Sequence, residues 1–344
     1  MVDVESYTLQ EILSQPDAWA KALETMAGEK ARIQAFFQGQ AFEEVIFTGC
    51  GSTYYLSLSA AELFQRFTGV YARALPASEI WLNPSTFKRN GKGLIIPISR
   101  SGETSETIRA CEKFKSENGG KCITISCYPG MPLTKLGDLN IILPSGQEQS
   151  IAQTRAFSTL HLACAYLTSV AINREYLIDG FPKLPEIGRK LIPVCENLAK
   201  KLGCDERFDR FYFLGSASRY GLACELNLKM KEMSLSFSEA FHFLEFRHGP
   251  KSMVTESTLI IGLVSEAQSE NEQAVLHEME EEGATILSIG ESGTSIEFQS
   301  NLPEDIRNIL YLPFGQMLAY ERAIFKKLNP DKPNNLDAVV RLEI

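Results

Sequence analysis

The 344-residue sequence lacks the features that membrane and redox proteins need. No apolar run approaches the roughly 18 residues that cross a bilayer, and the first five residues are acidic rather than an apolar leader. Its eight cysteines form no Cys-x-x-Cys pair, and most lie in apolar segments, as reduced core cysteines do. We therefore expect a cytoplasmic protein with no membrane segment.

The sequence also has little positive charge and few histidines. Lys and Arg number 34 against 43 Asp and Glu, which gives a formal net charge of −9. An acidic chain repels nucleic acids and anionic membranes, so neither is expected as a partner. The four histidines show no metal-ligand spacing with one another or with a cysteine, so no bound metal is expected.

The remaining composition is that of a folded α/β protein. Hydrophobic residues make up 44% of the chain, and its length predicts two domains, at roughly 100–200 residues each. Short apolar segments alternate with helical stretches, which predicts layered α/β domains with mainly parallel sheets. The expected strands are Val45 to Phe47, Leu94 to Ile98, Cys122 to Ser126, Asn140 to Leu143, Phe211 to Leu214, Leu259 to Val264, Thr285 to Ile289 and Ile309 to Leu312.

The order of these segments repeats. Residues 45–52 resemble residues 211–218, and residues 94–97 resemble 259–262 at nearly the same offset. This similarity predicts two copies of one domain. We expect a helical arm over 1–30, a first domain over 31–170, a helical connector over 171–203, a second domain over 204–330 and a tail over 331–344.

The junction after the apolar run 93–97 contains the most chemical information. Ser99, Ser101 and Thr104 offer hydroxyls, and Gly102 permits a tight turn into a helix. Hydroxyls and backbone N–H groups at a helix N-terminus suit a phosphate or another small oxyanion. The alternative is a plain N-cap, which is Ser or Thr followed by Glu within three residues. A cap needs only one hydroxyl, so the set favours binding. We call residues 99–104 the cradle.

A second glycine-containing turn, residues 49–54, also follows a strand. A dinucleotide site is one interpretation, but Tyr54 stands where the third glycine is needed and no acidic residue ends the next strand. Ligands gather at the carboxyl ends of parallel strands, so we expect Ser52 and Thr53 to face the same pocket as the cradle. The matching segment of the second half, residues 264–269, has an acid and no glycine, so only the first half is expected to bind phosphate.

These motifs together resemble the sugar isomerase (SIS) family. The similarity is to the tandem two-domain type found in the isomerase half of glutamine:fructose-6-phosphate aminotransferase and in hexosamine-phosphate deaminases, and it covers nearly the whole chain. It implies two tandem doubly wound, flavodoxin-like SIS domains. The motifs that carry it are residues 9–16, 50–54, 99–104, 152–157, 228–232, 247–250 and 334–336.

The resemblance also implies roles for individual residues. The sugar phosphate would be held by Ser99, Ser101 and Thr104 together with Thr53, and the sugar chain would be lined by Ile151 and Gln153. Glu232 would move a proton between C1 and C2, and Lys229 would assist. His248 would reach the site of a neighbouring subunit and help to open the ring, which implies a homodimer. No metal or organic cofactor is implied.

The residues alone favour a plainer interpretation of this helix. Glu225, Lys229, Glu232 and Ser236 share one face beside an apolar face formed by Leu222, Leu226, Met230, Met233 and Phe237. A solvated ion-pair face would explain this spacing. His248, before Gly249 and Pro250, would likewise suit an exposed helix end. The resemblance reverses both preferences.

The chain departs from the family pattern at several positions. Val2 is not the N-terminal cysteine nucleophile, so glutamine-dependent amination is not expected. Ala338 stands where the aminotransferase tail has a lysine, which leaves open whether Lys332 or Arg341 compensates. Arg100 replaces a glutamine and would add charge to phosphate binding, while Gln153 replaces a serine.

Three functions remain open. The first is deamination of glucosamine or galactosamine 6-phosphate to a ketose 6-phosphate and ammonia. The second is aldose–ketose isomerisation of a phosphosugar without nitrogen, with the same residues. The third is a sugar-phosphate sensor without turnover, which the presence of Glu232 and His248 and the lack of a basic helix-turn-helix segment disfavour.

Overall fold

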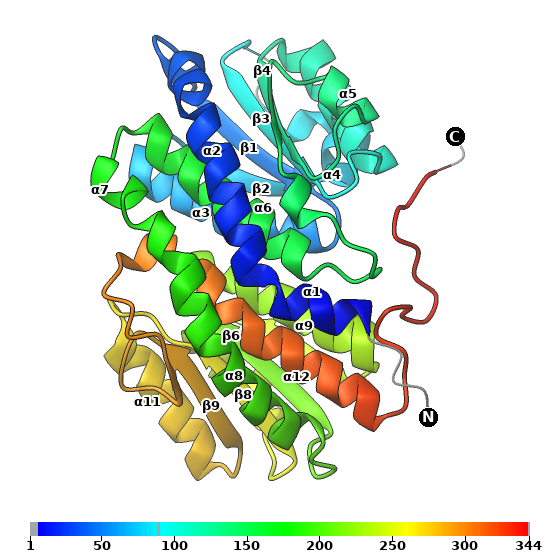
Figure 1. Cartoon of the computed structure of the whole chain (residues 1–344), viewed down its shortest axis with the longest axis vertical. Helices are drawn as coiled ribbons and strands as arrows, with labels where there is room; N and C mark the ends of the chain where they lie inside the picture. Colours follow the sequence, from blue (N-terminus) through cyan, green and yellow to red (C-terminus); the bar gives the residue numbers. More distant parts are fainter. Residues whose placement is uncertain (1–5, 88–89, 343–344) are drawn as a thin grey trace. The chain divides into compact units, whose positions relative to one another are not determined.

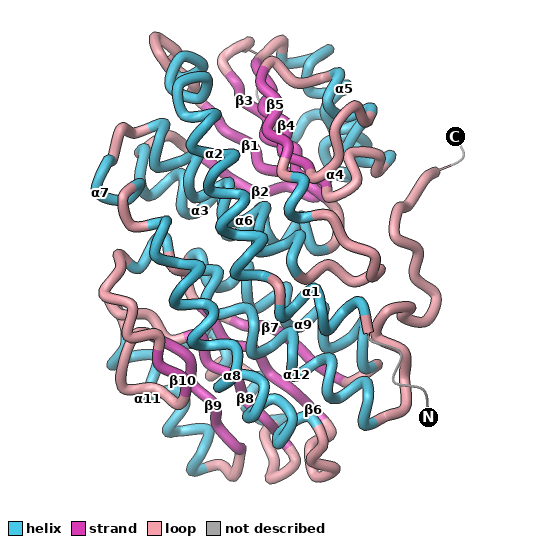
Figure 2. The backbone as a smooth tube through the Cα atoms, in the orientation of Figure 1, coloured by secondary structure: helices cyan, strands magenta, loops and turns pink. Residues whose placement is uncertain are grey.

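The computed structural model describes residues 6–87 and 90–342. The chain divides into two units, each with a sheet flanked by helices (Figures 1 and 2). The first-sheet unit comprises Asp17–Glu148, Arg155–Pro182 and Asp337–Ile344. The second-sheet unit comprises Met1–Pro16, Gln149–Thr154 and Lys183–Leu336.

The first-sheet unit has five parallel strands in the order β2-β1-β3-β4-β5. The strands are β1 (Glu44–Gly49), β2 (Ala72–Pro76), β3 (Gly93–Ser99), β4 (Lys121–Ser126) and β5 (Leu139–Ile142). The helices are α2 (Gln15–Phe37), most of which belongs to this unit, α3 (Ser52–Thr68), α4 (Ala77–Leu82), α5 (Ser105–Asn118), α6 (Arg155–Ala171) and α7 (Glu175–Ile178). Short 3-10 helices are η1 (Pro84–Thr86), η2 (Pro132–Lys135), η3 (Pro144–Gly146) and η4 (Phe181–Lys183).

The apolar composition of the central strands explains this layering. Every residue of β1 and β3 is buried, so both faces of the sheet must be covered. Helices α4 and α5 pack together on one face, where Phe114 and Ala110 meet Ile46 and Ile95. Figure 1 shows α3 and α6 on the other face. This arrangement leaves the carboxyl ends of the strands as the place where polar turns gather.

The second-sheet unit repeats this topology, with five parallel strands in the order β7-β6-β8-β9-β10. The strands are β6 (Arg210–Gly215), β7 (Phe237–Phe241), β8 (Thr258–Leu263), β9 (Thr285–Gly290) and β10 (Ile296–Glu297). The helices are α1 (Tyr7–Leu13), α8 (Leu184–Gly203), α9 (Ser218–Ser234), α10 (Phe243–Phe246), α11 (Ser269–Glu281) and α12 (Leu312–Phe325). Short 3-10 helices are η5 (Pro250–Met253), η6 (Glu304–Ile306) and η7 (Asn308–Tyr311).

The internal repeat is confirmed by the matching strand orders, and the expectation of two doubly wound domains with parallel sheets is confirmed. One expected strand is wrong, because Ile309 to Leu312 forms η7 and the start of α12. Pro313 occupies the first turn of α12, a position where the missing N–H costs nothing. The apolar run is a buried helix entry, which hydrophobicity alone does not distinguish from a buried strand.

Within residues 6–87 and 90–342, no helix combines the length and the apolar character that spanning a bilayer requires.

Candidate functional site

The cradle lies between the end of β3 and the start of α5, and its own hydroxyls shape it. The Gly102 N–H donates to Ser99 Oγ (3.1 Å), and the Glu103 N–H donates to Ser101 Oγ (3.1 Å). The Ser99 and Thr104 hydroxyl oxygens lie 3.3 Å apart. Thr104 is the N-cap of α5, yet its side chain makes no capping hydrogen bond. A plain N-cap therefore does not explain Thr104, and the hydroxyls together with the helix N-terminus suit an anion.

Gly102 is required at this turn. Its φ is +70°, and a Cβ there would lie 2.8 Å from Met131 Cβ. Both the backbone conformation and the close approach of Met131 therefore exclude larger residues.

Arg100 does not extend from the cradle as a free cation. Its side chain is buried, with Nη1 3.3 Å from Glu148 Oε2 and Nη2 donating to the Ala338 carbonyl at 3.1 Å. Glu148 also accepts from the Ala156 N–H (3.0 Å). Arg100 thus connects the cradle to a buried carboxylate and to the chain's tail.

The tail of the first-sheet unit makes further contacts with the cradle. Arg341 pairs with Glu103 (2.8 Å), and the Leu342 N–H donates to Ser105 Oγ (3.1 Å). The Arg341 guanidinium is therefore already engaged by a carboxylate. Ala338 itself supplies only its backbone carbonyl, to Arg100.

The turn after β1 is adjacent to the cradle, because β1 and β3 are neighbours in the sheet. Ser52 and Thr53 are both buried at the start of α3. Thr53 Oγ1 donates to the Cys50 carbonyl and accepts from the Cys50 N–H, both at 3.0 Å. The structure thus brings the turn of Ser52 and Thr53 and the cradle together at the carboxyl ends of the strands. The Thr53 hydroxyl, however, already forms hydrogen bonds within its own turn.

Ile151 and Gln153 belong to a short loop of the second-sheet unit, which the chain ends anchor. Glu11 accepts from the Gln149 N–H (2.5 Å) and the Ser150 hydroxyl, and the Ile151 N–H donates to the Asp331 carbonyl (3.3 Å). The buried amide oxygen of Gln153 has no hydrogen-bond partner among the described residues. A buried oxygen that accepts no hydrogen bond is energetically unfavourable unless a water or a ligand donates one to it. No local pattern of residues marks Glu11 as the anchor of this loop.

Helix α9 carries a buried ion-pair chain. Lys229 Nζ lies 3.2 Å from Glu225 Oε1 and 2.5 Å from Glu232 Oε2. The Glu225 and Lys229 side chains are fully buried, while Glu232 is 19% exposed. A solvated ion-pair face is therefore the wrong interpretation of this spacing, and Glu225 is the buried end of the ion-pair chain. Ser236 lies beyond the end of α9 and does not extend the face.

Lys229 stays charged between these carboxylates. Burial lowers the pKa of its ammonium, but Glu225 and Glu232 raise that pKa by more, so the net shift is upward. The cluster therefore holds two carboxylates against one cation. Of the three side chains, only that of Glu232 is in contact with solvent.

His248 belongs to the same unit as Glu232 and is exposed. It follows α10, and its backbone N–H donates to the Glu245 carbonyl (2.9 Å). No group of three or more His, Cys, Asp or Glu side chains in the described part of the chain is arranged to hold a metal ion.

Comparison with known proteins identifies the family. Two segments, residues 42–171 and 207–303, match the model of the SIS domain, and together they cover more than half of the chain. The chain belongs to the SIS domain family. The two matched segments contain the strands of the two sheets, so the internal repeat is a pair of SIS segments.

Individual relatives give further detail. The chain is 27% identical over 98% of its length to the glutamine–fructose-6-phosphate aminotransferase of Pyrococcus horikoshii, but it spans only 58% of that relative. The crystal structure of glucosamine-6-phosphate deaminase from Thermotoga maritima matches with a TM-score of 0.88 and 30% identity, over 98% of this chain and 100% of that one. Tagatose-6-phosphate ketose/aldose isomerase from Escherichia coli has a TM-score of 0.88 at 20% identity, covering 100% and 99% of the two chains, and shares the fold.

The second-sheet unit has no cradle at the corresponding position, but instead has arginines that pair with carboxylates of the same unit. After β8, the Ser265 N–H donates to Glu272 Oε2 (2.5 Å), and Arg219 pairs with Glu304. The buried Arg307 pairs with Glu266 (2.7 Å) and with Glu291 (3.1 Å). Internal carboxylates thus compensate the arginines there, which leaves little positive charge for an external anion.

Proposed function

We propose that this SIS protein is an amino-sugar 6-phosphate deaminase. It would convert glucosamine 6-phosphate or galactosamine 6-phosphate to a ketose 6-phosphate and ammonia. The observation that carries the proposal is the end-to-end likeness to the Thermotoga maritima deaminase, which at 30% identity covers that whole chain. The longer aminotransferase relatives contain additional sequence that this chain does not match.

The cradle is the proposed phosphate site. Ser99, Ser101 and Thr104 would donate hydroxyl hydrogens to the phosphate oxygens, with the α5 N-terminus adding its partial positive charge. Ser52 and Thr53 would approach from the neighbouring turn, and Arg100 would contribute charge from beside the cradle. Ile151 and Gln153 would line the sugar chain, since Gln153 has a buried amide oxygen without a partner among the described residues.

Glu232 is the proposed base. In the open-chain sugar its carboxylate would take the proton from C2 while O1 takes up a proton from water, which forms an enolamine. The carboxyl group would then return its proton to C1 as the nitrogen gives one proton up to the hydroxide, which leaves a neutral ketimine at C2 that adds water and releases ammonia. Lys229, 2.5 Å from Glu232 Oε2, would fix the carboxylate's orientation.

His248 is proposed to help open the sugar ring, acting across a homodimer on the partner's substrate. Its exposed position after α10 leaves it accessible for that role. The steps need side chains and water but no cofactor, and we place the enzyme in the cytoplasm.

The direct test is to incubate the purified protein separately with glucosamine 6-phosphate and galactosamine 6-phosphate, and to assay ammonia and ketose phosphate in the same tubes. Equal amounts of both products from one sugar are expected. Ketose formation from phosphosugars without nitrogen, with no ammonia from either amino sugar, would point to an isomerase instead. Thermal stabilisation by hexose phosphates without any turnover would point to a sensor.

The cradle's role has a matched internal control. Ser99 Oγ accepts from the Gly102 N–H, and Ser265 Oγ in the second SIS segment accepts from the Gln268 N–H (2.9 Å), also three residues on. Ser99→Ala and Ser265→Ala therefore remove the same kind of turn hydrogen bond. We expect Ser99→Ala to weaken sugar-phosphate binding about tenfold or more, because a charge-assisted hydrogen bond is lost, and Ser265→Ala to leave it unchanged.

Isothermal titration calorimetry with a hexose 6-phosphate measures both variants. Equal weakening in the two would mean that general destabilisation, rather than a phosphate contact, explains the effect. Unchanged binding in Ser99→Ala would remove the cradle from the account.

A further inference from the structure

Ser126 is the last residue of β4 and lies directly beside Ser99 of the cradle. The register of β3 and β4 pairs Ser99 with Ser126, and it pairs Ile95 with Cys122 four residues earlier. Side chains four residues apart in a strand point to the same face of the sheet. Ile95 and Cys122 belong to the apolar cluster that α5 covers, so Ser99 and Ser126 also face the side of α5.

The Ser126 hydroxyl is buried and makes no hydrogen bond with the described residues. The residue is 0% exposed, and its Oγ lacks a partner there. Such a hydroxyl is energetically unfavourable unless a water or a ligand supplies the missing hydrogen bond. Burial does not distinguish Ser126 from the cradle, because Ser99 is only 2% exposed.

The backbone fixes the position of this hydroxyl. The Ser126 carbonyl accepts from the Leu143 N–H (2.9 Å), and the Cys127 N–H donates to the Arg100 carbonyl of the cradle (3.0 Å). Neighbouring strands lie about 4.8 Å apart. The hydroxyls of Ser99 and Ser126 are therefore spaced to contact two oxygens of one phosphate group, on the side of the sheet where the first turn of α5 presents its N–H groups.

The second-sheet unit has no hydroxyl at either of these positions. The repeat places Val264 at the position of Ser99 and Gly290 at the position of Ser126. A Cβ at Gly290 would lie 3.1 Å from the Val264 carbonyl oxygen and 3.1 Å from Thr294 Cγ2, so a serine would be crowded there. The pair of hydroxyls thus belongs to the unit that carries the cradle.

We propose that Ser126 is a further phosphate-binding residue of the substrate site. Its hydroxyl donates a hydrogen bond to one phosphate oxygen of the sugar phosphate, while Ser99 donates to another beside the N-terminus of α5. This role rests on the proposed phosphate site at the cradle, but it does not depend on the reaction that follows binding.

Isothermal titration calorimetry with inorganic phosphate and with glucose 6-phosphate tests this role without turnover of an amino sugar. Ser126→Ala is expected to weaken the binding of both about tenfold or more, because a charge-assisted hydrogen bond is lost. Its melting temperature is expected to stay at or above that of the wild type, because the change removes no hydrogen bond between described residues. Wild-type affinity in Ser126→Ala would overturn the proposal. Weaker binding together with a lower melting temperature would also overturn it, since that result indicates a structural role.

Thr159 provides the matched control. It is 0% exposed, and its hydroxyl likewise has no partner in the described part of the chain. It lies on α6, which covers the other face of the sheet (Figure 1). Thr159→Val removes an equally buried hydroxyl at nearly constant volume and is expected to leave phosphate binding unchanged. Equal weakening in Thr159→Val and Ser126→Ala would indicate a general effect of core hydroxyls and would contradict the proposal.

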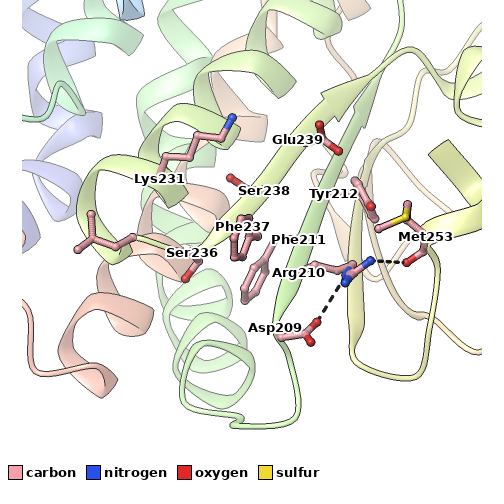
Figure 3. Close-up of a pocket in the computed structure, with 11 residues that line it drawn as sticks. Asp209, Arg210, Phe211, Tyr212, Lys231, Ser236, Phe237, Ser238, Glu239 and Met253 are labelled. Carbon is pink, nitrogen blue, oxygen red and sulfur yellow. Dashed lines mark hydrogen bonds and ion pairs between the residues drawn. The ribbon is translucent and has the colours of Figure 1, made fainter.

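A second control addresses a different place for the anion. A cavity of about 880 Å³ at the amino ends of β6 and β7 has two cations in its lining, Arg210 and Lys231 (Figure 3). Arg210 donates to the Met253 carbonyl (2.8 Å), so Lys231→Met is the change to make. It is expected to leave binding unchanged, because ligands of parallel α/β sheets bind at the carboxyl ends of the strands. Weaker binding in Lys231→Met than in Ser126→Ala would place the anion in this cavity and refute the role of Ser126.

The ammonia assay separates this role from the proposed reaction. Phosphate binding that weakens in Ser126→Ala, in a protein that releases no ammonia from either amino sugar, would refute the deaminase and support the role of Ser126. Ammonia release by the wild type, with the same phosphate affinity in wild type and Ser126→Ala, would refute the role of Ser126 alone.

Discussion

Replacing Glu232 with glutamine is expected to lower kcat for ammonia release by about 10²–10⁴, the range that a positioned acid or base contributes. The amide keeps the size of the side chain but cannot take the C2 proton. Sugar-phosphate binding is expected to stay close to wild type, because the cradle lies in the other unit of the chain. Steady-state kinetics and calorimetry on the same preparation separate the two quantities.

The matched control is Glu245→Gln, an exposed glutamate in the same unit as Glu232. It is expected to keep wild-type kcat. If Glu232→Gln retained full activity, another group would be the base and the proposed mechanism would fail. A loss of binding equal to the loss of turnover would instead indicate that Glu232 holds substrate rather than moving its proton.

Replacing Lys229 with methionine is expected to reduce the free energy of unfolding by about 3–5 kcal/mol, as removal of one partner of a buried ion pair does. The variant leaves Glu225 fully buried without the ammonium that lies 3.2 Å away in the wild type. Urea denaturation at neutral pH measures the change. The fold has no nearby solvent to hydrate the abandoned carboxylate, since the Glu225 side chain is 0% exposed.

The double variant Lys229→Met with Glu225→Gln serves as the control for this prediction. Removing both buried charges eliminates the uncompensated carboxylate, so most of the lost stability is expected to return. Equal stability of wild type and Lys229→Met would mean that the ion pair contributes nothing to folding. Failure of the double variant to recover would attribute the loss to packing rather than to charge.

The sequence was sufficient to predict the central strands and the repeat. β1, β3, β6 and β8 are continuous apolar runs bounded by glycine or polar turns, and these features depend only on neighbouring residues. The edge strands β2, β7 and β10 were not predicted. β2 contains Arg73 and ends in Pro76, and such residues are tolerated at a sheet edge because one side of the strand is unpaired.

Residue spacing alone favours the wrong environment for the α9 face, for a physical reason. Acid and base at i, i+3 and i, i+4 form the same pattern whether the face is in water or buried. Only the packed structure shows that Glu225 and Lys229 are fully covered. The spacing in the sequence therefore identifies the charged side chains of this face. Whether they are solvated or buried is seen only in the structure.

Contacts between distant segments were also inaccessible to sequence analysis. The sequence predicts that Arg100 adds charge to the cradle, but it does not indicate its partners in the structure, which are Glu148 and the Ala338 carbonyl, 238 residues away along the chain. Glu11 and Asp331 likewise anchor the loop of Ile151 and Gln153 from the two ends of the chain. Contacts with backbone carbonyls or with residues far away in the sequence produce no local sequence pattern from which they could be predicted.

The central claim is that a carboxyl group moves the sugar's proton, and turnover in D₂O tests it most directly. The Glu232 side chain is 19% exposed, so its bound proton can exchange with solvent before it reaches C1. NMR of the ketose phosphate is predicted to show deuterium at C1 in the wild-type reaction. Full conversion to ketose phosphate and ammonia with no deuterium at C1 would mean that the proton reaches C1 without passing through a group that exchanges with solvent, and would contradict this account of Glu232.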